Sequence, residues 1–226
     1  MFLYIFFIIG LFKVINAVVE NENVLINHLL ESNNICTLNI NSEIDITKEI
    51  KINSSIQRLY IIGDSLDKAK LNLKYPLYFD SSIEEVVIEN INIDGNLFFK
   101  NNEKITINAV NLNGYIDSDF DDNNSNEYIE ITKLNYKPLG EPVENCINLV
   151  GNIKINKSNF YGNSSCQNRL LHYNGLSKYS FDLKESFFNG AYECPFLNIE
   201  NALNANIETS YFEKGYSSSF IDGGYI

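Results

Sequence analysis

One short pattern recurs five times along the chain and limits its fold more than any other feature. In each copy apolar and polar residues alternate, the alternation slips by one position and resumes, and a glycine follows. The glycines that end successive copies lie 19, 48, 28 and 25 residues apart, and the interval of 48 fits two units. Repeats of this length are typical of stacked, solenoid architectures. The copies are residues 86–95, 105–114, 153–162, 181–190 and 205–215.

The alternation predicts short strands that bend once. Ile105 and Ile107 share one face of a strand, and the polar residues beside them face the other way. A slip of one residue before Val110 would reverse the facing of a straight strand, so we expect the chain to bend there. A further apolar stretch follows each glycine, as at 97–99, which gives three strands per turn. Strands of successive turns would then pair in parallel, about 4.8 Å apart.

The apolar positions of the repeat predict two inward-facing columns that form a continuous core. A helical fold is excluded because β-branched residues dominate the repeat, glycines interrupt it, and no period of 3.6 residues persists. The first column is Ile88, Ile107, Ile155, Leu183 and Ile207, and the second is Ile93, Leu112, Phe160, Phe188 and Phe212.

Residues 1–17 have the features of a secretory signal peptide, with an apolar run over 2–12 and the small Ala17 at the cleavage position. An uncleaved anchor is the alternative, although the apolar run is short for a membrane span. We expect a protein that is secreted or held at the cell surface, and soluble after signal cleavage. Cleavage leaves 16 basic and 29 acidic residues, a net charge of −13, which argues against nucleic-acid and anionic-membrane partners.

The two ends of the expected solenoid differ. Residues 18–34 are predicted to form a capping helix, because Leu25, His28 and Leu29 fit one face and the first turn needs a cover. The parallel β-helix is expected over 35–226, where the chain stops within a turn. Either the chain is a truncated piece of a longer solenoid, which we favour, or its open C-terminal turn makes an end-to-end contact with another molecule.

Residues 116–145 break the register of the repeat and are predicted to form an irregular acidic insertion. Asp117 and Asp119 alternate with other residues as at the start of a calcium-binding loop, but the glycine and glutamate that such a loop needs are missing. We therefore expect a solvated acidic loop, and neither a metal ion nor a cofactor is predicted. Asn123 in this segment and Asn163 after a repeat glycine are glycosylation candidates, since both fall in expected loops.

The cysteines predict a cross-link between turns. Cys166 and Cys194 each lie four residues past a repeat glycine, so we expect them on adjacent turns at a separation that suits a disulfide. Cys146 paired with Cys166 is the second choice of pairing, and a column of buried free thiols is the alternative to a disulfide. No spacing of cysteine and histidine indicates a zinc site.

The repeat with its Ser-x-Phe step, the tetrad 160–163 and the late Gly-Gly motif at 223–226 resemble right-handed parallel β-helix repeat proteins. Adhesin-like secreted or cell-surface chains, including the polymorphic outer-membrane type, are most similar. The run at 92–96 is also similar to the Ile-Asp-Gly-Asn of pectin lyase-like chains, but the motifs that supply the catalytic acids, histidine and cation of those enzymes are missing. The resemblance implies an all-β, right-handed parallel β-helix with a short N-terminal capping helix.

The resemblance and the repeat together predict a structural or adhesive role, in which exposed strand faces contact polysaccharides or surface proteins. Tyr161, Phe187 and Tyr211 are the candidate binding residues, because outward aromatic rings can stack on sugars. No catalytic residue is assigned. The alternative is a carbohydrate-active enzyme, a polysaccharide lyase or a glycoside hydrolase, whose carboxylate pair assembles across turns. Its candidate carboxylates are Asp94 with Glu89 or Asp182.

Overall fold

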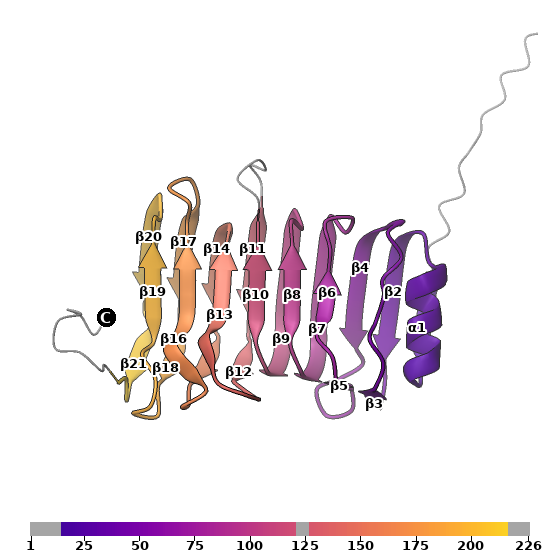
Figure 1. Cartoon of the computed structure of the whole chain (residues 1–226), viewed down its shortest axis with the longest axis horizontal. Helices are drawn as coiled ribbons and strands as arrows, with labels where there is room; N and C mark the ends of the chain where they lie inside the picture. The colour runs from indigo at the N-terminus through magenta and orange to yellow at the C-terminus, as the bar shows by residue number, and fades with distance from the viewer. Residues whose placement is uncertain (1–14, 121–126, 217–226) are drawn as a thin grey trace, which may run out of the picture.

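The chain coils into a parallel β-solenoid of about 8 turns in the computed structural model, which describes residues 15–120 and 127–216. The turns stand side by side along the longest axis, from helix α1 (Glu22–Glu31) at one end to strands β20 and β21 at the other (Figure 1). The all-β fold with one short helix near the N-terminus confirms the predicted fold class.

The strands of the described residues form two sheets, which we call sheet A and sheet B. Sheet A has 15 strands: β1 (Ile15–Val19), β2 (Asn34–Ile40), β3 (Glu43–Ile46), β4 (Ile56–Gly63), β5 (Lys70–Leu73), β7 (Glu85–Asp94), β9 (Lys104–Asn113), β11 (Tyr128–Thr132), β12 (Asn135–Lys137), β14 (Asn152–Asn156), β15 (Asn159–Tyr161), β17 (Ser180–Lys184), β18 (Phe187–Asn189), β20 (Asn204–Glu208) and β21 (Tyr211–Glu213). Sheet B has six: β6 (Leu77–Phe79), β8 (Leu97–Lys100), β10 (Ile116–Asp119), β13 (Val143–Val150), β16 (Cys166–Asn174) and β19 (Leu197–Glu200).

The two predicted core columns are confirmed by the pairing register. The interval of 48 residues between glycines contains two units, and the second unit adds Ile131 to the first column and Tyr136 to the second. Neighbouring phenyl rings of the second column stack, with centroids 4.5 Å apart for Phe160 and Phe188 and 4.9 Å apart for Phe188 and Phe212. The core is therefore continuous from turn to turn, as an unbroken stack requires.

The predicted bend is present in every unit, at the residue where the alternation slips. This residue has left-handed backbone geometry, with φ between 48° and 54°. The bend keeps both apolar pairs of a unit facing inward, whereas a straight strand would turn one pair outward. The conformation costs a non-glycine residue about 1–2 kcal/mol. The bend residues are Asn90, Ala109, Lys133, Lys157, Glu185 and Thr209.

The Ser-x-Phe step that follows the bend in the later units forms a ladder of hydroxyls, of which those of Ser158 and Ser186 are buried. The backbone N–H of Ser158 donates to Ser186 Oγ at 3.2 Å, and that of Ser186 donates to Ser210 Oγ at 3.2 Å. Each hydroxyl also donates within its own turn, as Ser186 Oγ does to the Lys184 carbonyl at 2.8 Å. These serines satisfy backbone groups at the bend that would otherwise be buried without a partner.

The predicted capping helix is confirmed, with narrower bounds than 18–34. The Asn21 side chain caps α1 by accepting from the Val24 N–H at 3.1 Å, and Leu25 and Leu29 are buried under the helix. Strand β1 precedes the helix and pairs with β2, so residues 15–17 of the predicted signal peptide contribute backbone pairing. The rest of that segment, like the chain after residue 216, lies outside the described residues.

The prediction of an irregular insertion over 116–145 is wrong. Strands β10, β11, β12 and the start of β13 fall in this range and complete an ordinary turn, while residues 121–126 lie outside the described residues. Ile129, Ile131 and Tyr136 keep the inward pattern of the repeat and are buried. The interval of 48 residues predicted a second unit, but its strands were not located because its next glycine comes only at Gly140, so that the alignment on a terminal glycine failed.

We predict that Ala109→Gly increases the free energy of unfolding by about 0.5–1 kcal/mol. Glycine adopts the left-handed backbone conformation without the steric cost that alanine has there. The greater backbone entropy of glycine in the unfolded chain offsets part of this gain. Denaturant unfolding followed by circular dichroism measures the change. Ala205→Gly is the matched control, because Ala205 lies within strand β20 and is not among the residues with positive φ. It should decrease stability, and equal losses in both variants would contradict the interpretation of the bend.

Candidate functional site

The outward side chains of sheet B line a groove that runs across the turns. Side chains alternate along each strand, so the residues between the inward positions point away from the core. A hollow of about 800 Å³ lies over these strands, from β8 to β19. We call it the sheet B groove. The outward column that passes through it, in register from β6 to β19, is Tyr78, Phe98, Asp117, Asn148, His172 and Asn198.

One wall of the groove comes from the longer starts of β13 and β16. Both strands begin earlier than their neighbours in sheet B, and the register between them shifts between Val143 and Asn145. Across the extension, Asn168 Nδ2 donates to Glu144 Oε1 at 2.8 Å. A two-stranded extension of this kind is only marginally stable without further support. The wall residues are Val143, Glu144, Asn145, Asn168 and Arg169.

A disulfide supplies that support. Cys146 on β13 and Cys166 on β16 are bonded, with Cα atoms 5.2 Å apart and both side chains buried. The preferred prediction, Cys166 with Cys194, is therefore wrong, and the second choice is correct. Leu171 pairs with Leu197, and Cys166 lies five residues before Leu171 whereas Cys194 lies three residues before Leu197. Cys166 and Cys194 therefore do not hold the equivalent positions on their turns that the count from the repeat glycine indicates.

Cys194 is instead a buried free thiol. A Cβ atom on Gly162 would lie 2.3 Å from Cys194 Sγ, so the glycine leaves the space that the sulfur occupies. Burial raises the pKa of the Cys194 thiol to about 12. Such a thiol is inert at neutral pH, as is typical of structural cysteines.

The floor of the groove carries hydrogen-bonding groups on successive turns. Burial raises the pKa of Asp117, although the hydrogen bond with the Asn148 side chain opposes this shift. Two turns further on, Asn198 Nδ2 lies 3.2 Å from His172 Nδ1 and donates to Glu200 Oε1 at 2.7 Å. An amide nitrogen only donates, so His172 Nδ1 accepts and Nε2 carries the proton. The floor thus offers both donors and acceptors to a ligand.

An aromatic surface lies at the N-terminal end of the groove. The rings of Tyr78 and Phe98 stack with centroids 5.0 Å apart, and Tyr78 is 53% exposed. Tyr115 also lines the groove, and its hydroxyl donates to the Glu141 carbonyl, which fixes the ring. Exposed, fixed rings beside polar groups are the usual means of holding a ligand with apolar faces and polar edges.

The predicted binding residues lie outside this groove, on the outer face of sheet A. Tyr161 and Phe187 meet edge to face with centroids 5.9 Å apart, and Lys137 Nζ lies 5.5 Å from the Tyr161 ring centroid. Tyr211 pairs in register with Phe187 and is 70% exposed. The structure therefore brings Tyr161 and Phe187 into contact and places Tyr211 beside Phe187 on the next strand, and we call the three residues the aromatic cluster. A second hollow, of about 580 Å³, includes Tyr211 in its lining.

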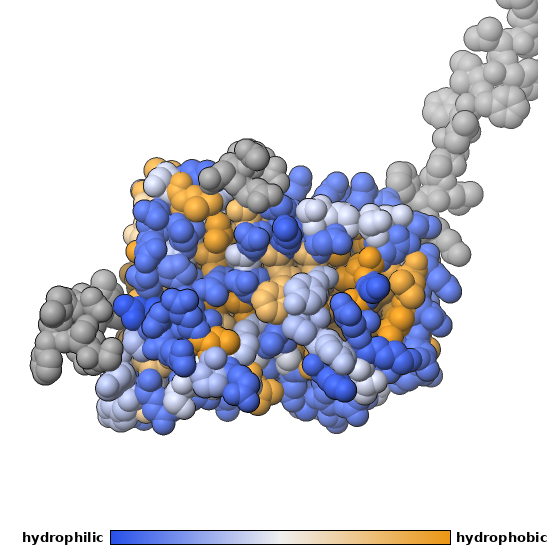
Figure 2. Space-filling view, in the orientation of Figure 1, coloured by the Kyte–Doolittle hydropathy of each residue, from blue (hydrophilic) through white to orange (hydrophobic). Residues whose placement is uncertain are grey.

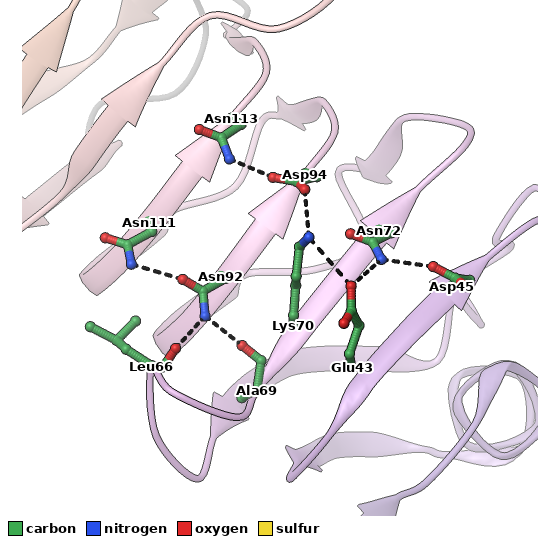
Figure 3. Close-up of polar contacts among 10 residues, drawn as sticks. All are labelled: Glu43, Asp45, Leu66, Ala69, Lys70, Asn72, Asn92, Asp94, Asn111 and Asn113. Atoms are coloured by element: carbon green, nitrogen blue, oxygen red, sulfur yellow. Dashed lines mark hydrogen bonds and ion pairs between the residues drawn. The ribbon is translucent and has the colours of Figure 1, made fainter.

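The carboxylates proposed for catalysis belong to polar ladders that join adjacent turns of sheet A, and Figure 3 shows the ladder that contains Asp94. Asp94 accepts from Lys70 Nζ at 2.8 Å and from Asn113 Nδ2 at 2.5 Å. Glu89 accepts from Asn108 at 2.9 Å, and Asp182 accepts from Asn206 at 2.9 Å. Each of these carboxylates accepts a hydrogen bond from a side chain of an adjacent turn. This structural role accounts for their presence without any catalytic role. The abundance of asparagine between acidic residues was the sequence signal for such ladders.

The remaining sequence candidates give little further information on a site. Asn163 lies in the loop after β15, where its Oδ1 accepts from the Ser165 N–H at 2.8 Å, and Asn123 lies outside the described residues. Within the described part of the chain, no group of three or more His, Cys, Asp or Glu side chains is arranged to hold a metal ion. The same residues contain no helix long and apolar enough for a membrane span.

Comparison with protein-family models, with curated proteins and with solved structures finds no match to this chain. The resemblance to adhesin-like and pectin lyase-like proteins therefore stays a prediction. Most of the visible face of the solenoid is hydrophilic, with hydrophobic patches between (Figure 2).

We predict that the solenoid loses stability in acid. Burial would raise the pKa of Asp94, but the hydrogen bonds from Lys70 and Asn113 outweigh this effect and lower the pKa. The hydrogen bond from Asn72 lowers the pKa of Glu43. Carboxyl groups with a lowered folded pKa stabilise above their unfolded pKa, about 4, and this contribution disappears as the pH falls through the folded values. The melting temperature should hold between pH 7 and 5 and drop below pH 4, and less steeply in Lys70→Met. An unchanged melting temperature at pH 3 would contradict this.

We predict that Cys146→Ala with Cys166→Ala decreases the free energy of unfolding by about 3 kcal/mol, because the cross-link restricts the unfolded chain. Cys194→Ala is the matched control, since it removes a buried sulfur from the next turn without breaking a cross-link. Denaturant unfolding of both variants measures the difference. Equal losses would show that packing of the sulfur atoms, rather than the cross-link, stabilises this region.

Proposed function

We propose that the protein is a secreted or cell-surface solenoid that adheres to polysaccharides through the sheet B groove. The observation that carries the proposal is the outward column of sheet B, which presents stacked rings at Tyr78 and Phe98 and then polar side chains on each following turn. The column runs along the stack of turns, so an extended chain can contact several turns at once.

The chemistry of the groove suits a sugar polymer. A pyranose ring has apolar faces that pack on aromatic rings and hydroxyl edges that both donate and accept hydrogen bonds. Phe98 and Tyr115 supply the rings, and Asn148, His172 and Asn198 supply donors and acceptors. Strands of adjacent turns are about 4.8 Å apart, close to the advance of one sugar along an extended glycan. The disulfide favours an oxidising, extracellular location for this function.

Catalysis on the same ligand is the second candidate, and one observation favours it. Burial raises the pKa of Asp117, which lies in the groove, and a raised carboxyl pKa is the property that a general acid needs. The candidate acid thus differs from Asp94, Glu89 and Asp182, which are held in the ladders of sheet A.

The test is binding of the full chain to a panel of plant and microbial polysaccharides, with released reducing or unsaturated ends measured in the same samples. Phe98→Ala and His172→Ala should each weaken binding about tenfold, the factor that corresponds to about 1.4 kcal/mol of contact. Release of sugar ends that Asp117→Asn abolishes would instead establish the enzyme.

Tyr211→Ala is the control for the test, because Tyr211 is an exposed ring of the aromatic cluster on the other sheet. It should leave the affinity unchanged. Loss of binding in Tyr211→Ala, with no effect of the groove variants, would move the adhesive surface to the aromatic cluster. A native chain that binds no polysaccharide in the panel would reject the proposal.

A further inference from the structure

We infer that the sheet B groove selects uncharged glycan chains and rejects acidic ones, such as chains that contain uronate or sulfate groups. This inference rests on the proposed function and adds the class of ligand. It follows from the balance of charges inside the groove and from the partners that these charges already have.

Carboxylates outnumber cationic side chains in the groove. Asp117, Glu144 and Glu200 line it, against the single guanidinium of Arg169. Each carboxylate is hydrogen-bonded to an asparagine amide, and none of the three forms an ion pair within the described part of the chain. Their negative charge is therefore not neutralised by the protein, and it would repel an anionic chain at close range.

Arg169 does not reverse this balance. It pairs in register with Asn145, which directly follows Glu144, and so the only guanidinium of the groove stands on the same wall as a carboxylate. Its Nη1 donates to the Asn168 carbonyl at 2.8 Å, which occupies part of the donor set. The disulfide between Cys146 and Cys166 holds both strand starts, and thus both charges, in place. An acidic sugar that approached Arg169 would also approach Glu144.

The other polar groups of the groove match hydroxyls rather than anions. Asn148 and Asn198 each carry an acceptor as well as donors, and His172 Nε2–H is a donor without a full charge in the tautomer that Asn198 sets. Hydroxyl groups can satisfy both kinds of partner, whereas carboxylate and sulfate groups only accept. The net charge of −12 for the whole chain repels polyanions before contact, within a Debye length of about 10 Å at 0.1 M salt.

The experiment compares one polymer in two forms, a neutral β-glucan and the same β-glucan after oxidation of its C6 hydroxyls to carboxylates. Binding of the full chain to both is measured by titration calorimetry at pH 7. The oxidised polymer should bind at least about tenfold more weakly at low salt, and the gap should narrow at high salt as charge repulsion is screened.

Two variants test the origin of the selection. Asp117→Asn and Glu200→Gln should each shift the ratio of the two affinities several-fold toward the oxidised polymer, and Glu200, which is exposed, serves if Asp117→Asn does not fold. The control Asp182→Asn removes a carboxylate from the outer face of sheet A, where its partner is Asn206. It should leave both affinities and their ratio as in the native chain.

The outcomes separate the two ideas. Binding of the oxidised polymer as tight as or tighter than the neutral one overturns the selection and leaves the adhesive function in place. A ratio that changes equally in Asp182→Asn also overturns it, because the charges of the groove would then have no special effect. Binding of neither polymer, nor of any other neutral chain, overturns both the selection and the proposed function.

Discussion

Parallel hydrogen bonding between successive turns is the interaction on which the whole structure depends. A single turn of this chain has too few inward side chains to form a core, and both of its edges are unpaired. Stacking pairs the edges and joins the inward residues into columns, from Ile88 and Ile93 to Ile207 and Phe212. The same register aligns the outward positions of successive turns, one strand spacing apart. The polar ladders and the sheet B groove therefore arise from the pairing that builds the core.

The two outer faces use this register differently. On sheet A, asparagine and lysine side chains bind carboxylates of an adjacent turn, as Lys70 and Asn113 do with Asp94. These donors and acceptors are therefore already hydrogen-bonded to one another. On sheet B, the shifted start of β13 and β16 raises a wall, and side chains of the floor remain open to a hollow. The floor groups are hydrogen-bonded too, Asp117 with Asn148 and Asn198 with His172 and Glu200, but the hollow above them gives a ligand room to reach them.

Much of the fold could be predicted because its signals are local. The alternation at Ile105 and Ile107, and the slip before Val110, require strands and a bend, and both are present. The predictions failed where the outcome depended on how distant parts of the chain pair. The second unit of the 48-residue interval was expected but its strands at 128–137 were not located, because its glycine is late. Cys194 was chosen over Cys146 because the count from the repeat glycine does not give the pairing of the strands. The aromatic cluster was predicted from outward positions, but the groove was not.

The amino-acid pattern alone settled the class of fold and, in the five aligned units, the inward residues and the position of the bend, because these follow from which neighbouring residues share a face of a strand. Only the tertiary structure decided which outward side chains meet. Turns of unequal length, such as those between Gly95, Gly114 and Gly162, bring Phe98, Asp117, Asn148, His172 and Asn198 into one column. That alignment depends on pairing between strands far apart in the chain, and pairing register is a property of the stack rather than of any one segment.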